Sequence, residues 1–150
     1  MIQRKQSVFL LLAFIASVVC LCLRIGDIEP AGMGVGFKLY NLMLDKGASV
    51  DYSPCGLFGI LLISSAMSLA TIFLYRNRKL QSGLCLCNVF LLLAWYIVLG
   101  VVTRNVVSAD ANFHIAFAAC LPAVSLVLNF MARAGVIHDE KMVRAADRIR

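Results

Sequence analysis

The chain has 150 residues, of which 61% are hydrophobic and 15% are charged, and its formal net charge is +6. Soluble domains are about 45–50% apolar and about 25% charged, so this composition excludes an ordinary soluble domain and favours a membrane protein. The length allows one small domain, and no repeat, linker-like stretch or low-complexity segment divides residues 1–150.

The first predicted element is the uncharged run at residues 7–23, which follows Arg4 and Lys5. A secretory signal peptide has a similar layout, but no A-x-A-like cleavage site follows this run. The residues before Cys20 do not form a lipoprotein cleavage motif either. We therefore expect residues 7–23 to be retained as the first of four membrane spans.

Residues 24–53 form the one long hydrophilic connection. A loop of this length is seldom without structure of its own. The sequence alternates around Phe37 and Leu39, and the turn signal at residues 45–47 follows. These patterns predict a short β-ribbon in the loop at residues 24–53, outside the membrane.

The clearest membrane span is the uncharged run at residues 55–75. At about 1.5 Å per residue, a helix of this length crosses a hydrocarbon core of about 30 Å. Ser53 and Pro54 have the character of a helix N-cap and a first-turn proline. The basic cluster at residues 76–79 then predicts that this span ends on the cytosolic side.

Two further spans are predicted at residues 84–102 and 113–132. The second of these contains Pro122, which we expect to kink the helix, because a membrane helix tolerates a proline where its neighbours satisfy the freed carbonyl. Residues 133–150 have a weak apolar stripe among charged residues and predict a cytosolic helix that continues from the fourth span.

The basic residues test this layout. Ten Lys and Arg residues fall on the predicted cytosolic side and four fall outside, which favours both termini in the cytosol. This topology accounts for the net charge without a nucleic-acid partner. The lipid bilayer is the expected partner, and we expect a multi-pass membrane protein.

Polar residues within the spans suggest a common layer. No Asp, Glu, Lys or Arg lies inside a predicted span, which argues against an ion pump or an ion-coupled transporter. Because the spans alternate in direction, Ser68, Thr71, Asn88 and Asn129 all fall in the cytosolic half of the bilayer. Such a layer serves either helix packing through hydrogen bonds or the binding of a small polar ligand.

The six cysteines do not form a recognisable redox or metal motif. The topology places Cys20, Cys22 and Cys55 near the outer face, where a bridge from Cys20 or Cys22 to Cys55 is conceivable. Buried structural thiols and a membrane thiol enzyme are the other interpretations. His114 has no ligand partner at suitable spacing, so we expect neither a metal nor a cofactor nor a catalytic residue.

The two ends of the chain carry a resemblance. It opens with MIQRKQSVFLLLA and closes with HDEKMVRAADRIR, and it resembles small four-span membrane proteins of Bacteroidetes, the domain of unknown function family numbered 4293. The resemblance implies a multi-pass location in a bacterial inner membrane but no activity. Its signature positions here, all expected on the cytosolic face, are Gln3, Arg4, Lys5, Asp139, Glu140, Val143, Arg144, Asp147 and Arg148.

The sequence therefore predicts an all-α transmembrane protein, a four-helix bundle with both termini in the cytosol. The favoured function is a non-enzymatic interaction or assembly module that docks a cytosolic or membrane protein partner. The alternative is a small-ligand binding or transport protein that uses the polar layer, and the oligomeric state stays open. The expected docking residues are Arg4, Lys5, Asp139, Glu140, Arg144, Asp147 and Arg148, with Arg4 or Lys5 pairing to Asp139, Glu140 or Asp147.

Overall fold

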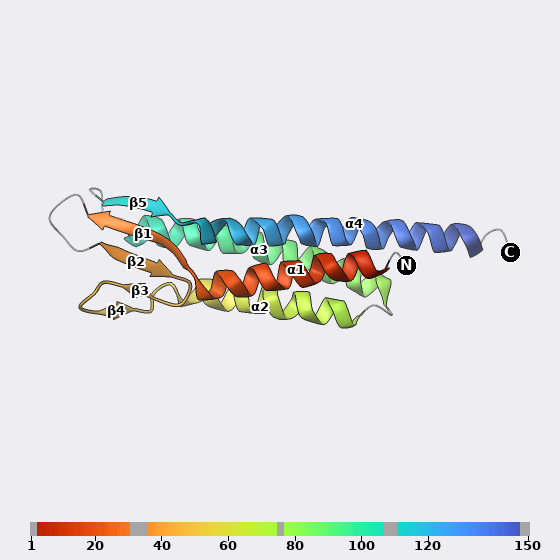
Figure 1. Cartoon of the computed structure of the whole chain (residues 1–150), viewed down its shortest axis with the longest axis horizontal. Coiled ribbons are helices and arrows are strands. Elements are labelled where there is room, and N and C mark those ends of the chain that lie inside the picture. The colour runs from red at the N-terminus through yellow and green to blue at the C-terminus, as the bar shows by residue number, and fades with distance from the viewer. Residues whose placement is uncertain (1–2, 31–35, 75–76, 107–110, 148–150) are drawn as a thin grey trace.

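The computed structural model describes residues 3–30, 36–74, 77–106 and 111–147, in which four α-helices and five short strands form (Figure 1). The helices are α1 (Gln3–Cys22), α2 (Cys55–Phe73), α3 (Arg78–Val106) and α4 (Leu121–Asp147). The strands are β1 (Arg24–Pro30), β2 (Phe37–Tyr40), β3 (Leu44–Asp45), β4 (Val50–Asp51) and β5 (Ala111–Ile115). A 3-10 helix, η1 (Phe117–Cys120), precedes α4.

The four helices lie side by side along the length of the molecule (Figure 1). Helix α1 contacts α2 and α4, and α3 contacts the same two helices. The strands gather at one end of these helices, whereas α1 begins and α4 ends at the opposite end (Figure 1). Helix α4 extends beyond the other helices at that end, so its last turns leave the helical packing (Figure 1).

The surface of the helices is apolar. Within the described ranges, α2, residues 80–106 of α3 and residues 117–143 are long and apolar enough to cross a membrane. The apolar part of α1, Gln6–Cys22, has 17 residues and is shorter than these three. Large side chains such as Phe90, Ile97 and Phe130 are exposed on the helices, which is the pattern of helices that face lipid.

Each helix that the sequence predicts is present, and α2 begins at residue 55 as predicted, but the predicted cap of α2 and the predicted start of the fourth span are wrong. Helix α2 begins at Cys55 with Pro54 at its N-cap, and no side chain caps it, so Ser53 does not have the predicted role. Helix α4 begins at Leu121 instead of residue 113, with Pro122 in its first turn. A proline fits the first turn because no helical partner is lost there, so the predicted kink is wrong.

The tail beyond residue 132 is helical, as predicted. Helix α4 continues through it without interruption to Asp147. Helix α3 also exceeds the predicted span at residues 84–102 at both ends.

The predicted ribbon is confirmed and is part of a larger sheet. The five antiparallel strands have the order β4-β3-β2-β1-β5, and β5 comes from the connection between α3 and α4. One row across four strands joins Asp45, Lys38, Asp27 and His114 as cross-strand neighbours. Opposite charges alternate along the first three of these residues, and such pairs support the register.

The β3–β4 hairpin has its own local polar contacts. Gly47 has a φ of 78°, a conformation that favours glycine, and its N–H donates to Asp45 Oδ1 over 2.8 Å. The backbone N–H of Ser53 and the Lys46 ammonium, 3.2 Å from Asp51 Oδ2, hold the pKa of Asp51 below its usual range. The hairpin is therefore closed by a turn glycine and by an exposed ion pair.

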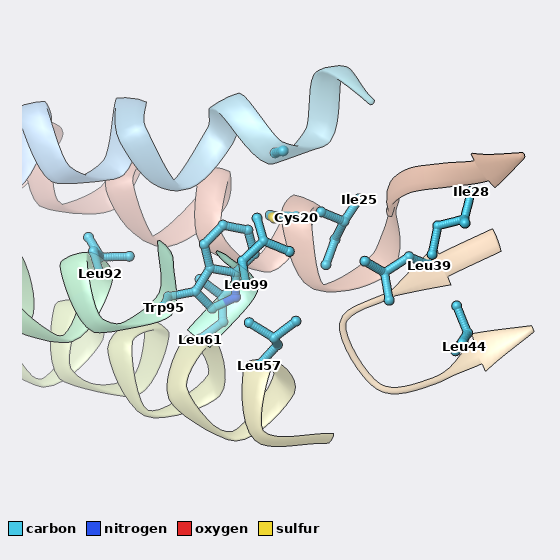
Figure 2. Packing of buried hydrophobic residues seen from close by; sticks show 11 residues of the cluster. Cys20, Ile25, Ile28, Leu39, Leu44, Leu57, Leu61, Leu92, Trp95 and Leu99 are labelled. Atoms are coloured by element: carbon cyan, nitrogen blue, oxygen red, sulfur yellow. The ribbon is translucent and has the colours of Figure 1, made fainter. Parts of the chain in front are cut away.

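One hydrophobic core connects the sheet to the helices. Figure 2 shows Ile25 and Leu39 close to Leu57 and Trp95 where the sheet meets the helix ends. All four side chains are fully buried. The sheet is therefore packed onto the helices through apolar contacts, which stabilise it in a position that short strands alone would not hold.

Gly26 provides a test of this packing. A Cβ atom at Gly26 would lie 2.7 Å from a ring carbon of Phe113 and 2.8 Å from the carbonyl oxygen of His114. Because the second contact is to backbone, we expect Gly26→Ala to lower the free energy of unfolding by about 1–3 kcal/mol. Thermal unfolding of the detergent-solubilised protein measures this loss.

Gly36, the residue before β2, gives the matched control. A Cβ atom there would meet its nearest neighbour, the carbonyl oxygen of Ile28, at 3.6 Å, which is an ordinary contact. Gly36→Ala is therefore expected to leave the melting temperature almost unchanged. Equal melting temperatures for the two variants would contradict the close approach of β1 and β5.

Candidate functional site

The first polar cluster is centred on Asn88 of α3, which is 1% exposed. Its Oδ1 accepts a hydrogen bond of 2.6 Å from Ser64 Oγ. Its Nδ2 donates to Ser68 Oγ over 2.7 Å and to Asn129 Oδ1 over 3.1 Å. Asn88 thus connects α3 to α2 on one side and to α4 on the other.

The cluster continues from α4 to α1. Asn129 Nδ2 donates to the carbonyl oxygen of Ser125, one turn earlier in α4, over 2.8 Å. Ser125 Oγ donates to the carbonyl oxygen of Ala13 over 3.0 Å, and Ser17 Oγ lies 3.1 Å from Ser125 Oγ. Hydrogen bonds therefore join all four helices through one buried polar layer.

The predicted polar layer is thus only partly the observed one. Ser68, Asn88 and Asn129 come together, whereas Thr71 Oγ1 donates to the carbonyl oxygen of Met67 in its own helix over 2.6 Å. A Ser or Thr hydroxyl can donate to the carbonyl oxygen four residues earlier in its own helix. The spacing of polar residues along one helix face does not show whether a hydroxyl bonds in this way or to another helix. Ser64, Ser17 and Ser125 are additional members.

The chemistry of this layer favours packing. Asn88 uses its carbonyl oxygen once and its amide group twice, so its carboxamide is engaged with the surrounding helices. The named side chains are all neutral amides and hydroxyls. In an apolar environment such groups stabilise helix association because they would otherwise lack partners.

A second polar cluster lies where the sheet meets the helices. Asn41, fully buried after β2, donates from Nδ2 to the carbonyl oxygen of Cys20 over 2.7 Å. Its Oδ1 accepts a hydrogen bond of 3.1 Å from Trp95 Nε1. Asn41 therefore supplies hydrogen-bond partners to a backbone carbonyl at the end of α1 and to the Trp95 indole of α3. No residue spacing in the sequence indicates this role.

A third polar cluster lies at the opposite end, between α1 and α4. Gln6 Nε2 donates to Asp139 Oδ2 over 2.5 Å, and Asp139 is 9% exposed. The other carboxylate oxygen, Oδ1, is buried and has no hydrogen-bond partner. Gly135 lies one turn before Asp139, and a Cβ atom there would be only 3.1 Å from Gln6 Cγ. The absence of a side chain at Gly135 lets Gln6 approach α4.

The predicted docking residues fall at this same end. Asp139 and Glu140 lie on α4, and Asp139 is bound by the neutral Gln6, which the sequence did not single out. The other predicted members are Arg4, Lys5, Arg144 and Asp147, on helices whose backbone is described, and Arg148, which lies outside the described residues. The side chains of Arg4, Lys5, Arg144 and Asp147 are outside the described part of the chain, and so are the ion pairs predicted for Arg4 and Lys5.

The cysteines and histidines do not assemble a reactive centre. All six cysteines are free thiols, so no bridge joins Cys20 or Cys22 to Cys55. Cys20 Sγ instead donates to the carbonyl oxygen of Ala118 over 3.4 Å. Among the described residues, no group of three His, Cys, Asp or Glu side chains could hold a metal ion.

Comparison with known families adds one finding. Residues 2–149 match the profile of the family described as Domain of unknown function (DUF4293). The chain belongs to this family. No curated protein matches it. The match extends over the four helices and the sheet, so all three polar clusters lie inside the DUF4293 region.

Asn88→Leu tests the role of the buried layer in this DUF4293 protein. The substitution keeps the approximate volume but leaves Ser64, Ser68 and Asn129 without their common partner. We expect a loss of about 1–2 kcal/mol in the free energy of unfolding, because interhelical hydrogen bonds contribute on this scale in membranes. Steric-trap or denaturant unfolding in micelles measures it.

Thr71→Val is the matched control for that substitution. Thr71 bonds only a carbonyl of its own helix among the contacts seen here, so its hydroxyl does not connect helices. The valine variant is expected to unfold within about 0.5 kcal/mol of the original chain. A loss as large as that of Asn88→Leu would show that interhelical bonding is not what distinguishes the layer.

Proposed function

We propose that this protein is an integral four-span protein of a bacterial inner membrane, with its four helices forming a transmembrane bundle. The apolar surface of α2, α3 and α4 supports this, together with the packing of α1 between α2 and α4. The 17 apolar residues of α1 extend about 26 Å, slightly less than a hydrocarbon core of about 30 Å. Local thinning of the bilayer accommodates such a difference at small cost.

The proposed orientation places the sheet outside and the opposite end in the cytosol. The start of α1 and the end of α4 lie together at that opposite end (Figure 1). Most of the basic residues of the chain belong to this end, and cytosolic segments near membrane spans carry the excess of Lys and Arg. The segments at the sheet end carry fewer Lys and Arg residues.

The proposed role is a non-enzymatic interaction or assembly module that docks a protein partner at its cytosolic face. The observation that carries this proposal is the continuity of α4, which is one helix of 27 residues that extends past the other three. A tail that binds the membrane surface would need a bend after the span so that it could lie in the interface. An unbent α4 instead carries Met142 and Val143, 53% and 46% exposed, away from the bilayer.

The alternative function, small-ligand binding or transport, would use the polar layer around Asn88. That layer directs its hydrogen bonds between the helices, which favours packing over ligand binding. A thiol enzyme has less support, because the cysteines are dispersed and none is paired. Docking is therefore the function that we propose.

Truncation tests the docking function. A chain that ends at Glu140 keeps the contact between Gln6 and Asp139 and removes only the projecting turns of α4. We expect it to insert normally but to lose a stoichiometric partner that full-length protein retains during purification from native membranes in mild detergent. Quantitative mass spectrometry of the two purified samples measures the difference.

The control is a full-length chain with Asp45→Ala, which alters the sheet at the far end. This variant should retain the partner at the level of the original chain. Equal recovery of every co-purified protein with and without residues 141–150 would contradict the proposal.

A further inference from the structure

Strand β5 is one edge of the sheet and is the less protected of its two edges. The strand order places β4 at the opposite edge. Strand β4 has only two residues, and the Lys46 ammonium lies 3.2 Å from Asp51 Oδ2 there. Short length and charged side chains both hinder the pairing of a further strand at an edge. Strand β5 has five residues, contains neither Lys nor Pro, and pairs with β1 in regular register.

The register determines which backbone groups of β5 face away from β1. The Ala116 N–H donates to the carbonyl oxygen of Ile25 over 2.8 Å, and this pair continues the register of the two strands. Successive residues of an antiparallel strand direct their N–H and C=O groups to alternate sides. His114 therefore bonds toward β1, as Ala116 does, whereas Phe113 and Ile115 direct both groups away from it. These outward groups of Phe113 and Ile115 define the β5 edge.

The β5 edge lies next to exposed apolar side chains. Within the described ranges, no strand pairs with this edge. The segments outside those ranges, residues 31–35 and 107–110, join the sheet at the end of β5 that begins with Ala111. At the other end, Ile115 is 69% exposed, and Phe117 in η1 is 81% exposed. This end of the strand therefore presents unpaired backbone groups together with apolar surface.

We propose that the β5 edge binds an extended segment of a partner protein, which adds a strand to the five-stranded sheet. The inference does not depend on the docking proposed for the end of α4. Such pairing satisfies the backbone groups of the edge and takes its specificity from alternate side chains. Phe113 and Ile115 lie on the same face of the strand, so the partner side chains beside them would be apolar.

The charges across the sheet predict one polar feature of the partner. Asp45, Lys38 and Asp27 alternate in sign along one row, and His114 is the next residue of that row. His114 Nε2 lies 3.8 Å from Glu29 Oε2, and both side chains are more than half exposed. Opposite charges on neighbouring strands support pairing. We therefore expect an Asp or Glu of the partner beside His114.

A second copy of this chain does not fit the same edge. The twofold axis of a dimer in one membrane lies along the membrane normal. The strands run roughly along the helices and so nearly along this axis (Figure 1). Rotation about an axis parallel to β5 would bring identical backbone groups to the same height, with N–H opposite N–H. Such edges form no ladder of hydrogen bonds, so the occupant is a segment of another protein.

Site-specific photocrosslinking in native membranes tests the proposal. A photoreactive phenylalanine analogue replaces Phe117 in one full-length chain and Tyr52, which follows β4 and is 60% exposed, in another. Both positions are aromatic and exposed, but only Phe117 adjoins the β5 edge. We expect a crosslinked protein from position 117 at a yield about tenfold above position 52. Mass spectrometry should place the crosslink in a segment that alternates apolar with polar residues and includes Asp or Glu.

Ile115 provides variants that separate backbone pairing from side-chain contact. In the chain with the analogue at position 117, Ile115→Val keeps the outward N–H and should leave the yield unchanged. Ile115→Pro removes that N–H and should lower the yield about tenfold, because one net hydrogen bond contributes up to roughly this factor in affinity. Ile115→Lys keeps the N–H but adds a charge to the edge, and should lower the yield to a similar extent.

Thermal unfolding in detergent tests the direction of the N–H groups. Ile115→Pro should retain the melting temperature of the original chain, since proline is tolerated where its nitrogen faces away from the sheet. His114→Pro removes an N–H that bonds toward β1 and should lower the melting temperature. If Ile115→Pro destabilises the protein as much as His114→Pro does, the assigned edge is wrong and the proposal is overturned.

The remaining outcomes also decide the question. Crosslinking only to lipid, to a second copy or to a helical segment overturns the proposal, and so does a yield at position 52 that equals the yield at position 117. An unchanged yield with Ile115→Pro or with Ile115→Lys rejects strand pairing. Loss of the crosslink in both of these variants, with its retention in Ile115→Val, supports the added strand.

Discussion

The hydrogen bonds of Asn88 are the constraint on which the arrangement of the helices depends. A carboxamide surrounded by apolar helices must find its partners inside the protein, and Asn88 finds them on α2 and α4 at once. Through Asn129 and Ser125, the same requirement fixes the face that α4 turns toward α1. Because α4 is one continuous helix, the same rotation also determines that Asp139 faces Gln6 of α1.

The sheet end has a comparable arrangement. Asn41 joins the last turn of α1 to Trp95, and apolar contacts from Ile25 and Leu39 surround this junction. Both ends of the helices are therefore fastened by one buried amide side chain, Asn41 at the sheet and Gln6 at the opposite end. Between them the polar layer sets the rotation of each helix. A structure held in this way is suited to presenting a helix in a defined orientation.

The sequence predicted the parts that depend on local composition. Uncharged runs located the four helices, and spacing with alternating direction brought together Ser68, Asn88 and Asn129. Strand β5 was missed because its partner β1 is distant in the chain, and a short apolar stretch before Pro122 fits a helix as well as a strand. The roles of Asn41 and of the Gln6 contact depend on the packing of separate elements, which no local pattern contains.

The claim most open to direct measurement is that the sheet and the projecting end of α4 lie on opposite sides of the membrane. One chain carries an epitope inserted between Gly47 and Ala48, in the exposed β3–β4 turn, and another carries it after Arg150. Antibody labelling of spheroplasts should detect the first epitope without permeabilisation and the second only after it. Detection of the second epitope on intact spheroplasts, or of both, would contradict the account.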